Sequence, residues 1–195
     1  SSELNENFLN IRNKIRLSKN SELHLINLIM VDSNKKFFSN TYEEIVLEDS
    51  AVLRNVYLQD NMNDGYFHKF VRHKLSKRSN YSSYVFPSGP KFNKFDLEYD
   101  LLGEESECKV IAATFLDQNN HQEIKTKVNH LAPNCKSYQK VKKVVSDGSK
   151  GVYQGKIFVK DIAQKTDAYQ LSKAILLGEN SEFDSKPELE IYADD

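Results

Sequence analysis

Several residue types and patterns are scarce in this chain, and each scarcity narrows the choice of protein class. The 195 residues include no tryptophan, only 7 glycines and only 4 prolines, which excludes collagen-like and linker-like chains. No stretch approaches the roughly 18 uninterrupted apolar residues that a membrane-spanning helix needs. Hydrophobic residues nevertheless make up 39% of the chain, so one good-sized domain with a continuous core is expected.

Charge of one sign is also lacking, because 27 basic side chains stand against 28 acidic ones and give a formal net charge of −1. This balance provides no overall field to attract nucleic acid or anionic lipid. Two basic stretches, residues 69–78 and 136–143, interleave cations with apolar side chains. Alternation along a strand predicts that their apolar side chains point inward and their basic ones outward, as on a solvated face.

The chain has two cysteines, Cys108 and Cys135, 27 positions apart. One disulfide is arithmetically possible, but a chain of this length needs no covalent staple, so reduced thiols are favoured. The first residues, 1–5, show no basic segment followed by a long apolar one, as a secretory signal would. These features together predict a cytoplasmic protein.

The N-terminal segment carries apolar residues at helical spacing. Leu4, Phe8, Ile11 and Ile15 recur at intervals of four and three, which predicts a helix over residues 3–19. The expected division of the chain is therefore a helical segment at 1–22, followed by a β-rich core at 23–195.

Beyond residue 22 the apolar pattern is that of short strands separated by turns rather than by helices. The absence of intervening helical patterns argues against a doubly wound sheet and leaves a sandwich, a closed barrel or a solenoid. Tight-hairpin pairs are rare, and wider corners favour the solenoid, although no strict short repeat is visible. The strand-like segments are residues 24–31, 45–47, 51–58, 67–75, 81–86, 92–101, 108–116, 123–131, 138–145, 151–159 and 187–192.

Chemistry-bearing motifs are few. The sequence has no Gly-x-Ser-x-Gly, no phosphate-binding glycine loop and no short signature pair of carboxylates. A polysaccharide-active solenoid enzyme remains an alternative, because its carboxylates and bases would be assembled by the coils. No catalytic residue, no cofactor-binding residue and no metal ligand is predicted.

A metal-binding module is the other alternative. Stacked coils could bring Cys108 and Cys135 to His121 and His130, and imidazole and thiolate are common ligands. Inert buried thiols, with surface or corner histidines at His24, His68, His73, His121 and His130, are the simpler interpretation.

The most specific pattern lies in the last third of the chain. Residues 151–159 (GVYQGKIFV), 163–170 (AQKTDAYQ) and 186–195 (KPELEIYADD) resemble the SufB/SufD family of iron–sulfur cluster assembly scaffolds. Weaker resemblance covers residues 121–133 and 57–59. The His-Leu-Ala-Pro segment and residues 44–59 are more similar to the SufD branch than to the SufB branch.

The resemblance implies an all-β fold, a right-handed parallel β-helix (β-solenoid), here with the short N-terminal helix in front. It also implies a non-catalytic, cytoplasmic scaffold subunit that works with a SufB-like subunit and a SufC-like ATPase, the cluster being handled by the full complex. In the family a Cys-x-His segment follows the Ala-Asp-Asp motif, whereas this chain ends at Asp195, so no cluster ligand can be assigned here. We expect a core truncated at its C-terminal end, whose open end pairs with a homologous subunit or a second copy.

The residues that match the family motif receive structural roles. Gly151 and Gly155 are expected at a turn or at a close approach of backbone. Gln164, Thr166 and Asp167 can satisfy backbone groups at a corner, and Pro187 fits the start of a strand. Lys186 matches the motif without a further assigned role.

Overall fold

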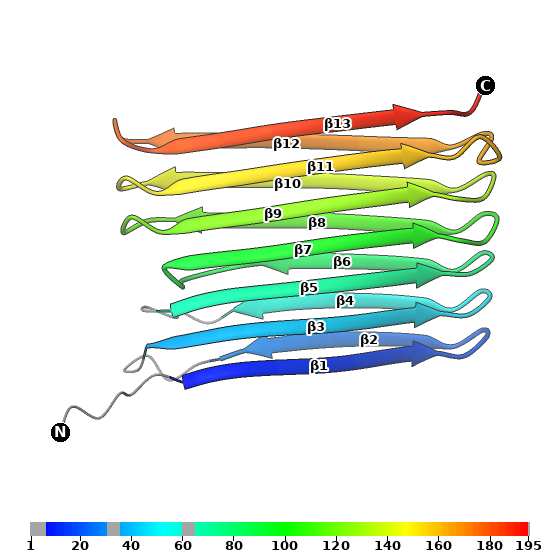
Figure 1. The fold of residues 1–195 in the computed structure, drawn as a ribbon, viewed down its shortest axis with the longest axis horizontal. Helices are drawn as coiled ribbons and strands as arrows, with labels where there is room; N and C mark the ends of the chain where they lie inside the picture. Colours follow the sequence, from blue (N-terminus) through cyan, green and yellow to red (C-terminus); the bar gives the residue numbers. More distant parts are fainter. Residues whose placement is uncertain (1–6, 31–35, 60–64, 195) are drawn as a thin grey trace.

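The computed structural model describes residues 7–30, 36–59 and 65–194, which form 13 β-strands and no helix (Figure 1). The odd-numbered strands make one seven-stranded sheet, sheet A. Its members in spatial order are β1 (Asn7–Leu17), β3 (Phe37–Leu47), β5 (Gly65–Leu75), β7 (Phe92–Leu101), β9 (His121–His130), β11 (Lys150–Val159) and β13 (Glu182–Ile191).

The even-numbered strands make the six-stranded sheet B, which lies behind sheet A (Figure 1). Its members are β2 (Glu22–Ile29), β4 (Val52–Gln59), β6 (Asn80–Phe86), β8 (Glu107–Leu116), β10 (Lys136–Ser146) and β12 (Asp167–Leu177). Every strand pair is parallel, for example β3 with β5 and β4 with β6, so the chain alternates between the two sheets and climbs one strand spacing per coil. The fold is therefore a parallel β-solenoid, as predicted.

The core fills the space between the two sheets and is built by period-two alternation. In β7, Phe95, Leu97 and Tyr99 are buried, whereas Asp96 and Glu98 between them are only partly so. The same phase holds in neighbouring strands because the register places inward residues opposite inward residues. Side chains of one face thus stack in rows that run across the strands.

The corners that follow the strands of sheet A share a repeating backbone conformation. Each contains one residue with a left-handed backbone conformation, at Asn20, Ser50, Arg78, Glu105, Asn134 and Lys165. At the first five of these positions the amide donates to a carbonyl of the next coil, as in Asn20 N to Asp49 O and Ser50 N to Lys77 O, both within 3.0 Å. The corners therefore extend the hydrogen-bond ladder between the sheets, and the prediction of wide corners in place of hairpins is confirmed.

At the four inner corners, the small residue that follows the left-handed position enters the core. Ala51, Ser79, Ser106 and Cys135 are all 0% exposed. The Cys135 thiol donates to Gly103 O at 3.3 Å and lies 3.4 Å from Ser106 Oγ. This thiol is thus a structural part of the corner.

The predicted helix at the N-terminus is wrong for residues 7–17, which form β1. Leu9, Ile11, Ile15 and Leu17 occupy its inner face at period two, and the strand pairs along its whole length with β3. Phe8 points outward and its ring stacks on Phe38, with centroids 5.0 Å apart. Leu4 lies outside the described residues. The spacing of three and four was a coincidence between two periodicities, and the available sheet edge of β3 decides in favour of the strand.

The prediction that basic side chains point outward holds only in part. In β5, Arg72 and Lys74 are on the outer face, but Lys69 and His73 point into the core at 4% and 0% exposure. In β10, Lys143 is likewise buried, at 2%. These inward positions become possible because each side chain finds a partner inside, as described below.

Other expectations concern single elements. The pattern did not indicate β12, and it indicated only the end of β3. Among the described residues there is no helix of the length and apolar character that crossing a membrane requires.

Candidate functional site

The last coil, formed by β12 and β13, leaves its core side open. Within the described chain, β12 pairs only with β10 and β13 only with β11. The inward-facing Leu176, Leu189 and Ile191 are 49%, 62% and 55% exposed. One coil earlier, the equivalent Ile157 and Val159 are only 5% and 3% exposed. An apolar surface that belongs to the core is thus presented at this end of the rod.

The two outer edges of this coil differ in hydrogen-bonding capacity. In a parallel strand, alternate residues direct their N–H and C=O groups to opposite neighbours. Glu182 N and Tyr192 N donate to Ser149 O and Val159 O, so even-numbered residues of β13 face β11 and odd-numbered ones face the free edge. Pro187 therefore removes a donor from the free edge and breaks no bond to β11.

The prediction that Pro187 begins a strand is accordingly wrong, because β13 begins at Glu182 and places Pro187 near its middle. Proline is tolerated there since the strand is terminal in the described sheet. In β12, Asp167 N donates to Cys135 O, so the even-numbered residues present their groups at the free edge. All 11 residues of β12 lack proline, which leaves an unbroken pairing edge.

The motif glycines lie within β11 and not at a turn. A side chain at Gly155 would collide with the Tyr153 hydroxyl and with the Gln170 side chain from β12. A side chain at Gly151 would meet the aliphatic part of Lys143 at 2.9 Å. Neither glycine has positive φ, so the close-approach prediction is the correct one.

The other motif residues serve the corner between β11 and β12 and the outer surface. Gln164 Nε2 donates to Asp161 O and Thr166 Oγ1 to Ala163 O, each at 2.8 Å, as predicted for backbone satisfaction. Asp167 is the first residue of β12. Lys186 points outward from β13 and pairs with Glu188 at 2.9 Å.

A polar network lies in the core toward the N-terminal end of the solenoid, on β3, β4 and β5. Lys69 Nζ lies 3.1 Å from Glu43 Oε2, and the two side chains are 5% and 1% exposed. The Tyr57 hydroxyl donates to Glu43 Oε1 at 2.5 Å and accepts from Asn55 at 2.8 Å. Burial lowers the pKa of Lys69 and raises that of Tyr57, while Glu43 opposes the first shift.

A second buried cation, Lys143, lies close to the open end. Its ammonium donates to Gln122 O at 3.1 Å and to the Gln122 side-chain oxygen. Burial lowers its pKa to about 7, against the weaker opposing influence of Glu123. At neutral pH this core position is thus poised between its charged and neutral forms.

We predict a rise in stability with pH that depends on Lys143. The unfolded lysine holds its proton up to its ordinary pKa of 10.5, whereas the folded one releases it at about 7. Between these values the unfolded state binds more protons, so the free energy of unfolding increases with pH, on the order of 1.5 kcal/mol from about pH 7 to about pH 8.5. Urea midpoints across this interval measure the effect.

Lys143→Met is the matched variant and should flatten the pH profile. The interval ends below the range in which the buried Cys108 thiol and buried tyrosines such as Tyr57 and Tyr99, whose pKa values burial raises, act with the opposite sign. An equal slope in the wild type and the variant would show that Lys143 is not the titrating group.

The histidines and cysteines of the metal alternative do not form a common site. Within residues 7–30, 36–59 and 65–194 no three His, Cys, Asp or Glu side chains are placed to hold a metal ion. Cys108 and Cys135 are free and buried. His121 Nε2 pairs with Glu123 at 2.9 Å, whereas His130 Nε2 contacts Ser137 Oγ at 2.9 Å.

Two of the five histidines contradict the expectation of surface or corner positions. His73 and His130 are 0% exposed, and burial lowers their pKa values to about 3 and about 4. The His73 ring stacks on Tyr99 with centroids 4.1 Å apart and donates from Nδ1 to Glu98 O. His24 and His68 do lie on the outer surface, paired with Glu22 and Asp96.

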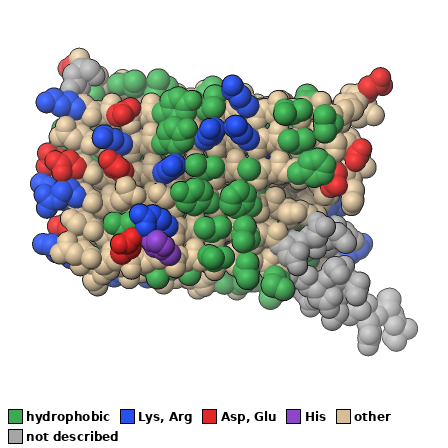
Figure 2. Space-filling view, turned by 180° about the vertical axis from the view of Figure 1, so that it is seen from behind, with side chains coloured by type: hydrophobic (Ala, Val, Ile, Leu, Met, Phe, Trp, Pro, Cys, Tyr) green, Lys and Arg blue, Asp and Glu red, His purple; other side chains and the backbone are tan. Residues whose placement is uncertain are grey.

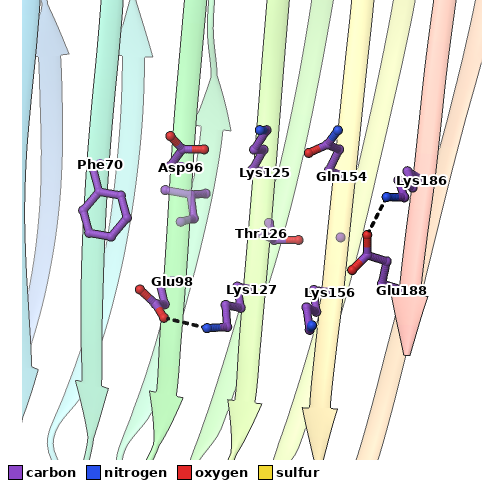
Figure 3. A pocket seen from close by; sticks show the side chains of 12 residues that line it. Phe70, Asp96, Glu98, Lys125, Thr126, Lys127, Gln154, Lys156, Lys186 and Glu188 are labelled. Carbon is purple, nitrogen blue, oxygen red and sulfur yellow. Dashed lines mark hydrogen bonds and ion pairs between the residues drawn. The ribbon is translucent and has the colours of Figure 1, made fainter. Parts of the chain in front are cut away.

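A hollow of about 280 Å³ on the outer face of sheet A is the place where a polysaccharide enzyme would have its groove (Figure 3). Its three carboxylates already have partners: Asp96 with His68 at 2.8 Å, Glu98 with Lys127 at 3.3 Å and Glu188 with Lys186 at 2.9 Å. The pairing lowers the pKa of Glu188. That direction is opposite to the raised pKa that a glycosidase acid needs.

Comparison with known proteins gives the family. The family model for "SUF system FeS cluster assembly, SufBD core domain" matches residues 2–195. The iron–sulfur cluster assembly protein SufD of Escherichia coli is 27% identical over 191 residues, which cover 97% of this chain and 45% of that protein. A SufBD family protein of Synechocystis is 25% identical over 81% of this chain and 35% of its own length.

A chloroplastic protein of Arabidopsis thaliana is also 25% identical, over 84% of this chain and 35% of its own length. The chain thus spans less than half the length of these curated relatives.

Proposed function

Since this chain belongs to the SufBD family of the SUF iron–sulfur cluster assembly system, we propose that it is a SufD-like scaffold core without catalytic activity of its own. Its proposed role is to pair through its open end with a homologous, SufB-like subunit. The observation that carries this proposal is the family match over residues 2–195 together with the parallel solenoid, whose strand edges can accept an added strand.

Within the described chain, the last coil has two features that suit pairing: exposed apolar surface and unpaired backbone groups. Leu176, Leu189 and Ile191 expose apolar surface that burial would stabilise at about 25 cal/mol per Å². The edge of β12 offers unpaired N–H and C=O groups to an added strand. Pro187 interrupts the edge of β13, so β12 is the better template for the partner.

The test replaces one donor on the free edge of β12. Ala174→Pro removes an N–H that faces away from β10 and leaves the bonds to β10 intact. We expect at least about tenfold weaker pairing with the SufB-like subunit, measured by sedimentation velocity or by co-purification of the full-length proteins.

His24→Pro is the control, because His24 lies on β2, the terminal strand of the same sheet at the opposite end. The circular dichroism melt of each variant checks that the coil is retained. Loss of pairing in His24→Pro with retention in Ala174→Pro would overturn the assignment of the pairing end.

The remaining proposals concern partners, cargo and location. We propose that the full-length protein co-purifies with a SufC-like ATPase as well as the SufB-like subunit. The cluster is cargo of that complex, and a stable, stoichiometric cluster on this chain alone, detected by absorbance and iron analysis, would refute the scaffold role. A cytoplasmic location is supported by the two free thiols, which are typical of reducing compartments.

A further inference from the structure

The outer face of sheet B differs in kind from the outer face of sheet A. On sheet A, outward cations and carboxylates pair across neighbouring strands, as in Lys14–Glu44 at 3.0 Å and Lys127–Glu98 at 3.3 Å. Such a face is well solvated without a partner. On sheet B, hydrophobic side chains fill much of the middle of the face, many charged ones lie on the left, and a group of lysine or arginine side chains lies in the upper middle (Figure 2).

The apolar residues of sheet B stand in rows that cross the strands. One row joins Ile26, Val56, Tyr84 and Ile111 by direct register. A second begins with Leu28, Leu58 and Phe86, of which Leu28 is 66% exposed. Surface of this extent, continuous over several strands, marks an interaction site more often than a solvated face.

A groove of about 460 Å³ opens at the β8–β10–β12 end of this face. Phe115, Val144 and Ile175 form one wall, and Phe115 and Ile175 are 57% and 61% exposed. Ala113, Lys142 and Lys173 form the opposite wall. The groove runs across the strands, with an apolar side and a cationic side.

The charge around the groove is positive and mostly without a counter-ion. Outward positions of β8, β10 and β12 carry the carboxylates Glu107 and Asp167 against five lysines: Lys109, Lys136, Lys140, Lys142 and Lys173. Within the described chain, only Lys136 of these five forms an ion pair, with Glu107 at 3.7 Å. A partner that fits must therefore bring negative charge.

We propose that this face of sheet B is the docking site for an amphipathic helix of a partner protein that carries carboxylates along one flank of its apolar stripe. Parallel strands repeat every 4.8 Å or so, close to the roughly 5.4 Å pitch of an α-helix, so a helix lying across the strands can seat one apolar side chain per strand. Its carboxylates would face Lys142 and Lys173. This surface is separate from the open coil end used in the proposed function.

Two other occupants fit the observations less well. A second copy placed symmetrically on this face would bring the lysines of one groove against those of the other, which is unfavourable. A bilayer surface would be attracted by the lysines, but a concave groove does not match a flat boundary, whereas a convex helix does.

The experiment uses a fluorescent helical peptide of about 14 residues with leucines at i, i+3, i+4 and i+7 and glutamates on the flank. Its partner peptide keeps the leucines and carries lysines in place of the glutamates. Fluorescence anisotropy should show binding of the acidic peptide and at least about tenfold weaker binding of the basic one.

Two variants locate the site and one serves as control. The double variant Lys142→Glu/Lys173→Glu and the single variant Phe115→Ser should each weaken binding of the acidic peptide about tenfold or more. Lys125→Glu changes an outward lysine of sheet A and should leave binding unchanged. All these positions are on outer faces, and circular dichroism verifies the fold of each variant.

Three results would overturn the proposal. The first is equal binding of the acidic and basic peptides, and the second is acidic-peptide binding that survives both sheet B variants. The third is occupancy by something else: concentration-dependent self-association abolished by Phe115→Ser, or binding of phosphatidylglycerol vesicles in preference to the peptide.

Discussion

Replacing Lys69 by methionine is expected to lower the free energy of unfolding by about 3–5 kcal/mol, because it strands the carboxylate of Glu43 in the core. The Glu43 side chain is 1% exposed, and its Oε2 lies 3.1 Å from the lysine ammonium. Lys69 also sits over the ring of Tyr57, 4.6 Å from the centroid. Methionine fills similar volume, so the loss reports the missing charge. Urea denaturation at neutral pH measures it.

Two comparisons make this result specific to the buried pair. The double variant Glu43→Gln/Lys69→Met removes both charges and should recover most of the loss, because no isolated ion remains inside. Lys127→Met breaks a pair of similar length on the outer face, Lys127 with Glu98, and should change stability by less than about 1 kcal/mol. Equal losses in Lys69→Met and Lys127→Met would mean that Lys69 is solvated in solution.

The inward lysines also show what the sequence could have revealed about the core. In β5 the buried positions are Phe67, Lys69, Val71, His73 and Leu75, so the lysine and the histidine share the phase of the apolar residues. In β10, Lys143 stands out of phase with the outward Lys140 and Lys142. The inward positions in the period-two alternation of β5 and β10 are thus enough to identify both buried lysines. Their partners, Glu43 and Gln122, could not be predicted, because they come from coils 26 and 21 residues away.

The solenoid was predictable, whereas its repeat was not. Short strands without intervening helices left a sandwich, a barrel and a solenoid open, wide corners favoured the solenoid, and the family resemblance decided for it. The repeating feature of the corners is a left-handed backbone followed by a small residue, which is buried at the four inner corners. The left-handed position is filled by asparagine, serine, arginine, glutamate and lysine, as at Asn20, Ser50, Arg78, Glu105 and Lys165. Because it is conformation that repeats and not chemistry, no sequence motif displays it.

The open end was predicted as a pairing site, but its geometry came only from the structure. The sequence does not tell which edge of a strand is free, so it could not show that Pro187 lies on the outer edge of β13. Nor did it indicate β12, whose apolar end, residues 174–177, is compatible with a helix as well as a strand. The pairing partner of β10 decides between the two, and that is a long-range contact.

Phe95→Ala is expected to cost about 3–5 kcal/mol of stability, by removing a fully buried ring and leaving a cavity between the two sheets. Phe95 is 0% exposed, and its ring lies 5.5 Å from that of Phe67 in sheet A and 6.3 Å from that of Tyr57 in sheet B. The ring thus joins the sheets in the middle of the rod. Urea midpoints, together with hydrogen exchange of β5, β7 and β9, measure the loss and its spread.

Phe92→Ala is the matched control, because it removes the same ring from the same strand but from the outer face. Phe92 stacks on His121 with centroids 5.2 Å apart and remains partly exposed, so less than about 1 kcal/mol should be lost. In a solenoid each coil contacts only the adjacent coils. Hydrogen exchange of β7 and the strands beside it should therefore accelerate more than that of β11. Equal effects of the two substitutions would contradict the inward–outward phase of β7, on which the assignment of every face of this rod depends.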